Sequence, residues 1–116
     1  MEDLRERTFR FAVRIVKLCE FLDVHPGVSR TLARQLLRSG TSIGANVEEG
    51  HASQSQADFT SKYYIACKEA RETHYWLRLL IASDIMTKDR LFELLDESNQ
   101  LIAILTSIVK KTKQSK

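Results

Sequence analysis

The sequence predicts an all-α protein, an antiparallel up-down-up-down four-helix bundle. Four long segments repeat apolar residues at alternating steps of three and four, which is the spacing of a helix seam. Short connections join these segments, and short connections place consecutive helices antiparallel. The chain of 116 residues holds one proline and four glycines, which are too few turn signals for a many-stranded β fold.

The first helix is expected from about Asp3 to Val24. One seam of apolar or small residues runs along it: Leu4, Thr8, Phe11, Ile15, Leu18 and Leu22. A second seam lies beside the first: Phe9, Ala12, Val16 and Cys19. Pro26 and Gly27 end the helix, because neither residue type continues one.

The second helix is expected from about Ser29, an N-cap residue type, to about Gly50, a glycine of the kind that follows helix C-termini. Its seam consists of Leu32, Leu36, Ser39, Ile43 and Val47. Gly40 and Gly44 lie on one face, although a mid-helix glycine costs roughly 1 kcal/mol relative to alanine. Small residues four apart let another helix come close. We expect a bulky partner from the third helix, with Tyr75 and Trp76 as the candidates.

The third helix is expected to begin at Ser55, with Asp58 three residues later as a near-capping box. Its seam is Phe59, Tyr63, Ala66, Ala70, Thr73, Leu77 and Leu80. Thr87 should cap the fourth helix, whose seam is Leu91, Leu94, Ser98, Leu101, Leu105 and Ile108. That helix also has a second seam: Phe92, Leu95, Ile102 and Val109.

The first and fourth helices therefore carry wider apolar faces than a monomeric bundle needs. Two explanations remain open at this point. The wide faces either fill a larger core, or the spare seams of these two neighbouring helices form a shared outer surface.

Composition argues against several classes of protein. No stretch approaches the 18 apolar residues that span a membrane, and the N-terminus is too charged for a secretory signal. Cys19 and Cys67 fall in helical apolar patterns, so we expect reduced, buried thiols in a cytoplasmic protein. A di-iron bundle needs two Glu-x-x-His pairs, and only Glu48 with His51 fits. The sequence has no phosphate loop, nucleotide fingerprint or nucleophile elbow. We therefore expect no metal, no cofactor and no enzyme activity.

The net charge of +3 is unevenly placed. Residues 25–47 carry three arginines and no acid, and residues 110–116 carry four lysines and no acid. We expect a bundle domain over residues 1–109 and a disordered basic tail over residues 110–116. Segregated basic groups suit contact with a polyanion. The candidate nucleic-acid-binding residues are Arg30, Arg34, Lys110, Lys111, Lys113 and Lys116.

The stretch from Gln35 to Gly50 resembles the hallmark helix of the 23S rRNA intervening-sequence family. The matching residues are Gln35, Leu36, Arg38, Ser39, Ser42, Ile43, Ala45, Asn46, Glu49 and Gly50. Val47 replaces an isoleucine, and Gly44 stands where the family often has proline. The resemblance covers nearly the whole chain. It implies a four-helix bundle, usually a homopentamer, with no established enzyme activity. Some relatives are encoded inside ribosomal RNA insertions; others resemble the accessory proteins of diversity-generating retroelements, which associate with nucleic acid and a reverse transcriptase.

Most of this motif is polar, and buried polar groups must pair or they destabilise a fold. Gln35, Arg38, Asn46 and Glu49 should lie on or beside the inward face. They either form a structural network with Glu69 or Glu72 of the third helix, or bind a ligand. The favoured function is a non-enzymatic oligomeric bundle that binds RNA or other nucleic acid. The alternative is a protein-binding scaffold without nucleic-acid contact.

Overall fold

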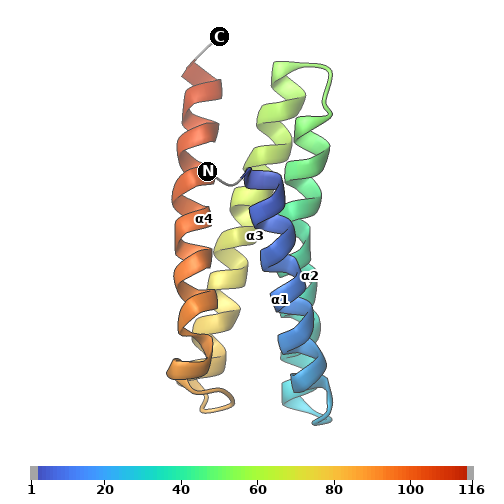
Figure 1. Ribbon diagram of the computed structural model, residues 1–116, viewed down its shortest axis with the longest axis vertical. Coiled ribbons are helices and arrows are strands. Elements are labelled where there is room, and N and C mark those ends of the chain that lie inside the picture. Colours follow the sequence, from blue (N-terminus) through green and yellow to red (C-terminus); the bar gives the residue numbers. More distant parts are fainter. Residues whose placement is uncertain (1–2, 115–116) are drawn as a thin grey trace.

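A computed structural model describes residues 3–114 and confirms the antiparallel four-helix bundle (Figure 1). The helices are α1 (Leu4–Asp23), α2 (Val28–His51), α3 (Gln56–Ala82) and α4 (Lys88–Gln114). They alternate in direction and form a rod of 47 × 23 × 20 Å. The closest packing joins α1 to α2, α2 to α3 and α3 to α4, whereas α1 and α4 make few contacts and α1 lies diagonally across from α3.

Side-chain caps begin three of the helices. Asp3 accepts a hydrogen bond from the backbone N–H of Arg5 at 3.1 Å, and this bond lowers the pKa of the Asp3 carboxyl. Ser55 Oγ accepts from the N–H of Asp58 at 3.0 Å, and Thr87 Oγ1 accepts from the N–H of Arg90 at 3.4 Å. The capping roles predicted for Ser55 and Thr87 are confirmed.

The predicted span of α2 is close to the observed one, but the capping roles predicted for Ser29 and Gly50 were wrong. The helix starts before Ser29, and its N-cap is Gly27, whose φ of 97° favours glycine. Gly50 is inside the helix rather than beyond it, and its φ is not positive. The Tyr63 ring of α3 lies so close that a Cβ at position 50 would sit 2.6 Å from it. Gly50 therefore serves a close contact between helices, not a helix end.

The predicted seams build the core. Most leucine, isoleucine and aromatic seam residues of the four helices are buried, among them Ile15, Leu36, Leu77 and Leu101. The members nearest the helix ends, such as Leu4 and Ile108, are partly buried and pack against this core. The polar seam residues are buried as well and bond locally. Thr73 Oγ1 donates to Ser39 Oγ at 2.9 Å across the α2–α3 contact, for example. No described side-chain nitrogen or oxygen is buried without a hydrogen-bond partner.

The small face of α2 meets a different helix from the one expected. A Cβ at Gly40 would lie 2.8 Å from Ile15, and one at Gly44 would lie 3.3 Å from Thr8 Oγ1 and 3.4 Å from the Thr8 backbone. Both neighbours belong to α1. The prediction that α3 packs against these glycines was wrong. Both α1 and α3 adjoin α2, and the spacing of the small residues does not indicate which of the two packs against them.

The spare seams of α1 and α4 do not form a shared surface. Ion pairs occupy the side where these helices meet: Arg7 Nε lies 2.6 Å from Glu97 Oε2, and Arg14 lies 3.1 Å from Glu93. In α4 most of the second seam packs against the core, which confirms the larger-core explanation for that helix. In α1 the second seam is divided: Phe9 and Val16 are exposed next to α2, whereas Cys19 is buried.

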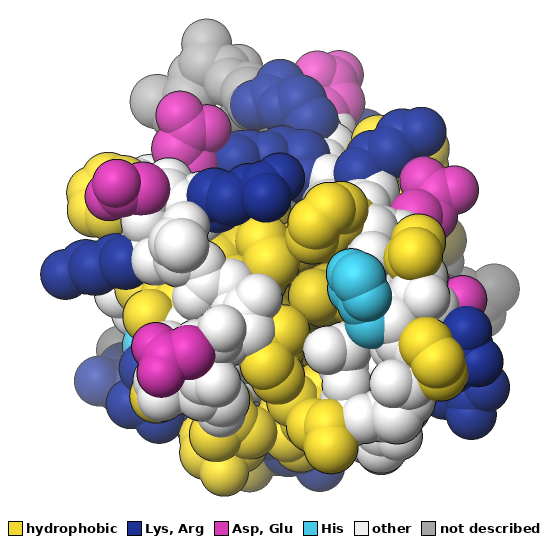
Figure 2. Space-filling view, turned by 90° about the horizontal axis from the view of Figure 1, so that it is seen from below, with side chains coloured by type: hydrophobic (Ala, Val, Ile, Leu, Met, Phe, Trp, Pro, Cys, Tyr) yellow, Lys and Arg dark blue, Asp and Glu magenta, His cyan; other side chains and the backbone are white. Residues whose placement is uncertain are grey.

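The two ends of the rod differ. At the end with the 24–27 and 83–87 connections, hydrophobic side chains fill the middle and charged side chains surround them (Figure 2). Arg90 of α4 stands 4.9 Å from the ring centroid of Phe21 of α1 at this end. At the other end α4 continues through residue 109 to Gln114, so the lysines up to Lys113 are helical rather than disordered. Lys116 lies outside the described residues.

Candidate nucleic-acid interface and polar network

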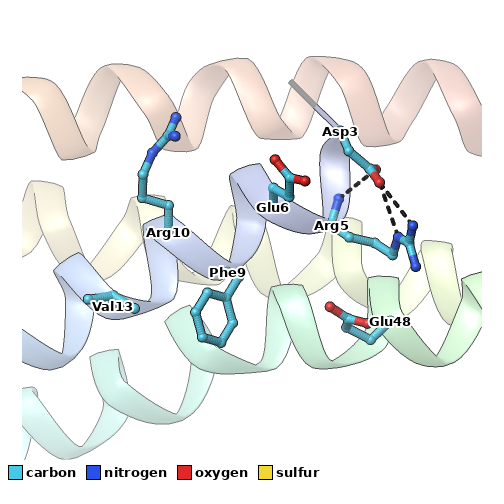
Figure 3. A pocket seen from close by; sticks show the side chains of 7 residues that line it. All are labelled: Asp3, Arg5, Glu6, Phe9, Arg10, Val13 and Glu48. Carbon is cyan, nitrogen blue, oxygen red and sulfur yellow. Dashed lines mark hydrogen bonds and ion pairs between the residues drawn. The ribbon is translucent and has the colours of Figure 1, made fainter. Parts of the chain in front are cut away.

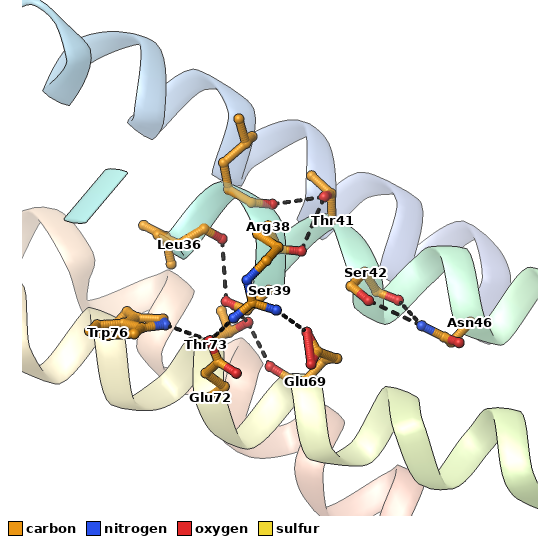
Figure 4. Close-up of polar contacts among 11 residues, drawn as sticks. Leu36, Arg38, Ser39, Thr41, Ser42, Asn46, Glu69, Glu72, Thr73 and Trp76 are labelled. Carbon is orange, nitrogen blue, oxygen red and sulfur yellow. Dashed lines mark hydrogen bonds and ion pairs between the residues drawn. The ribbon is translucent and has the colours of Figure 1, made fainter. Parts of the chain in front are cut away.

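The polar motif ties α2 to α3 through Arg38 (Figure 4). Its guanidinium donates to Glu69 Oε2 at 3.1 Å and to Glu72 Oε2. Trp76 Nε1 also donates to Glu72 Oε2, at 3.0 Å. The Glu69 side chain is only 10% exposed, whereas that of Arg38 is 52% exposed. The network predicted between Arg38 and these two glutamates is therefore present, at the edge of the core.

The other motif residues are not part of that network. Asn46 is half-buried and donates to the carbonyl and hydroxyl of Ser42, its neighbour on α2. Glu49 is exposed and pairs with Lys62 of α3 at 3.6 Å. Gln35 is exposed, so neither it nor Glu49 lies on the inward face as expected. Together with the Ser39–Thr73 bond, the motif therefore makes four separate contacts, and each joins groups of the protein itself.

The predicted basic residues fall into two groups at opposite ends of the rod (Figure 1). Near the start of α2, Arg30 Nε lies 3.1 Å from the Asp23 carboxylate and also donates to the Asp23 carbonyl. Arg34 is exposed one turn later. The charge count by segment missed the pair with Asp23, because the short connection folds the start of α2 back onto the end of α1.

The second group occupies the last turns of α4. Lys110, Lys111 and Lys113 are all exposed. Lys113 Nζ stands 5.3 Å from the ring centroid of Tyr64 on α3. The Gln56 side chain donates to the Thr112 carbonyl at 2.8 Å and fixes this end of α4 to the start of α3.

Sequence reasoning overlooked a third group on the outer face of α3. We call it the α3 stripe: Tyr64, Lys68, Arg71, Tyr75 and Arg78. Its members follow steps of four and three, so they share one helix face, and all are exposed. The signal was present in the sequence as this spacing. It was hidden because the charges were summed over the surrounding segment, which is net acidic.

An apolar strip marks the outer surface beside α1 and α2. It consists of Phe9, Val13 and Val16 of α1 and Leu37 of α2, which are between 38% and 66% exposed. Phe9 and Val13 line an open pocket of about 570 Å³ above α2 (Figure 3). Acidic and basic side chains border the same pocket: Asp3, Arg5, Glu6, Arg10 and Glu48.

Residues 3–114 hold no cluster of three or more side chains suited to a metal ion. Within the same range, no helix is both long and apolar enough to cross a membrane. Both cysteines are buried and unbridged, and burial raises the pKa of the Cys19 thiol to about 11.

Helix order, packing and the α2–α3 polar ties define this molecule as an up-down-up-down four-helix bundle with a polar second helix. The chain belongs to the 23S rRNA-intervening sequence protein family, whose family model matches residues 3–107. A crystal structure from Bacteroides thetaiotaomicron VPI-5482 is similar over 93% of this chain and 99% of its own, with 43% identity and a TM-score of 0.86. That protein is described as one of unknown function from the S23 ribosomal protein family. No curated protein matched the chain. The family predicted from the motif is thus confirmed, while the link to retroelement accessory proteins stays a prediction.

Proposed function

We propose that this protein is a non-enzymatic, oligomeric bundle that binds RNA or other nucleic acid through basic surface residues. The observation that supports the proposal is the segregation of charge. Exposed lysines gather in the last turns of α4 and exposed Arg34 lies near the start of α2, in two segments that contain no acid. Basic groups placed in this way gain affinity for phosphates by releasing counterions.

We expect the candidate residues to contribute unequally to the affinity for nucleic acid. Lys110, Lys113 and Arg34 are exposed, and we expect them to contact phosphates directly. Arg30 would have to share or give up its bond to Asp23, so its contribution should be smaller. Because the two groups lie at opposite ends of a 47 Å rod, one short oligonucleotide should not reach both.

Oligomerisation would strengthen weak contacts. A single chain of net charge +3 offers few phosphate contacts. Several copies held together would present several basic ends to one polymer, and multivalency raises the overall affinity without new contacts. The apolar strip is the surface that we expect the copies to bury.

The test is a titration of labelled single-stranded and duplex RNA at 50 and 200 mM salt. Lys110→Gln with Lys113→Gln should weaken binding and lower the slope of log K against log salt by about 0.7 to 0.9 per lost contact. Substitution is preferable to truncation, because the end of α4 also accepts the bond from Gln56. Lys17→Gln with Lys88→Gln is the matched control, since it removes two exposed lysines elsewhere. No binding by the wild-type protein at 50 mM salt would contradict the proposal.

A protein-binding scaffold is the second candidate function. The apolar strip favours it, because exposed apolar surface rimmed by charged residues is typical of protein interfaces. This candidate takes the lead if the wild-type protein binds neither form of RNA.

A further inference from the structure

The α3 stripe is a continuous basic and aromatic face. Its first and last residues, Tyr64 and Arg78, are 14 steps apart on one helix, a length of about 21 Å at 1.5 Å per residue. It lies on the helix diagonal to α1, on a different side of the bundle from the exposed apolar residues of α1. Oligomerisation through the apolar strip would therefore leave the α3 stripe open to solvent.

The cations of the stripe differ from the other basic residues in their surroundings. No carboxylate within residues 3–114 forms an ion pair with Lys68, Arg71 or Arg78. The glutamates of α3 face α2 instead and hold Arg38 there. The basic residues of α1 differ, since Arg7 and Arg14 pair with acids of α4. A row of cations without neutralising acids complements a row of phosphates.

The two tyrosines of the stripe add exposed aromatic surface to its positive charge. Tyr64 is 50% exposed and Tyr75 is 48% exposed, so each ring presents apolar surface to water. Each ring also has a cation over one of its faces: Lys113 stands 5.3 Å from the centroid of Tyr64, and Arg78 stands 5.8 Å from that of Tyr75. A ring with a cation over one face can stack an unpaired base on the opposite face, while the cation meets the adjoining phosphate.

We infer that the α3 stripe binds single-stranded RNA, with bases stacked on Tyr64 and Tyr75 and phosphates held by Lys68, Arg71 and Arg78. Duplex RNA should bind less well here, because its bases are already stacked and paired. At a rise of 3.4 Å per nucleotide, roughly six nucleotides match the stripe. This inference rests on the proposed nucleic-acid function. It assigns the binding of single-stranded RNA to a face of α3, whereas the basic residues predicted from the sequence lie on α2 and at the end of α4.

The experiment measures fluorescence anisotropy with a labelled 12-nucleotide single strand and with its duplex. Tyr64→Ala with Tyr75→Ala removes both rings and should lower single-strand affinity on the order of tenfold or more, with little effect on the duplex. Tyr64→Phe with Tyr75→Phe keeps the rings and should bind nearly as the wild type does.

A second pair of variants tests the cations. Lys68→Glu with Arg71→Glu should weaken single-strand binding and lower the salt slope by about 0.7 per lost contact. Lys17→Glu with Lys88→Glu changes the net charge equally and should have a smaller effect. All of these side chains are exposed, so circular dichroism should show folded proteins throughout.

The outcomes separate the two proposals. If the wild type binds neither probe at low salt, the proposed function fails and the inference fails with it. If the wild type binds but both stripe variants match it, only the inference is overturned, and binding belongs to the other basic residues. If the phenylalanine variant loses as much as the alanine variant, stacking is not the mode of binding.

Discussion

Gly40 shows at the scale of one residue why α2 tolerates glycine in its middle. A methyl group there would lie 2.8 and 2.9 Å from the branched carbons of Ile15, which is fully buried and cannot swing aside. Overpacking of a core costs about 1–3 kcal/mol. Alanine would regain only about 1 kcal/mol of helix propensity.

We therefore expect Gly40→Ala to lower the free energy of unfolding by on the order of 1 kcal/mol. Gly44→Leu should cost more, because its neighbour is the Thr8 backbone, which moves only if α1 moves. Urea denaturation measures both. Ala45→Gly is the control, because Ala45 is at an exposed position of α2. The change in its free energy of unfolding measures only the difference in helix propensity between alanine and glycine. A Gly40→Ala protein more stable than the wild type would show that α1 shifts easily.

We expect His74 to make the free energy of unfolding depend on pH. Burial, and secondarily the nearby positive charge of Arg78, lowers the pKa of this half-buried imidazole below its usual 6.5. Below pH 6.5 the unfolded chain therefore binds more protons at this site than the folded protein does. Stability should fall as the pH drops through this range.

Urea unfolding at pH 7.5 and 5.5 tests this expectation. His74→Gln should lose less stability than the wild type between the two values, since glutamine does not titrate. Arg78→Gln should reduce the loss in part, by removing one cause of the lowered pKa. An equal loss in the wild type and His74→Gln would assign the pH dependence to other groups.

At the scale of the helices, the sequence predicted what repeats along a helix and missed what depends on its neighbours. The seams and the caps at Ser55 and Thr87 were predictable, because the periodicity and the hydroxyl positions are local. The partner of Gly40 was not, since the α1 and α3 sides of α2 look alike in sequence. Within the candidate site, the Arg38 pairs were predictable because few inward acids were available. The Arg30–Asp23 pair could not be predicted without knowing how the α1–α2 connection folds back. The α3 stripe could not be recognised without knowing which side of α3 faces solvent.

The link from α2 to α3 through Arg38 gives an element-scale prediction. Arg38→Met leaves the nearly buried Glu69 carboxylate without its cationic partner. We expect a loss of about 1–3 kcal/mol in the free energy of unfolding, toward the lower end because Arg38 itself is half exposed. Arg34→Met, one turn away and exposed, should stay within about 0.5 kcal/mol of the wild type.

Chemical denaturation at pH 7 checks the pair of variants. Adding Glu69→Gln to Arg38→Met should recover part of the loss, because the orphaned charge is then removed. Equal stability of Arg38→Met and Arg34→Met would mean that the network contributes nothing. The polar motif would then need the ligand that was the other explanation for it.

At the scale of the whole molecule, the apolar strip is the feature that a monomer does not explain. Phe9, Val13 and Val16 follow one face of α1 and remain between 38% and 66% exposed. Burying such side chains contributes roughly 25 cal/mol per Å² of apolar surface. We expect a homo-oligomer that covers this strip, a pentamer if the chain follows the assembly implied by the family resemblance.

Light scattering at micromolar concentration tests this expectation, since the chain mass is 13.3 kDa and an oligomer gives a multiple of it. Phe9→Glu with Val13→Glu should return the protein to the monomer mass without loss of helix content, because both side chains point outward. Phe92→Glu is the matched control: this phenylalanine is 57% exposed on α4, away from the strip. It should leave the assembly intact. If Phe92→Glu dissociates the oligomer and the α1 pair does not, the subunits meet through α4 instead, and the strip remains available to a different partner.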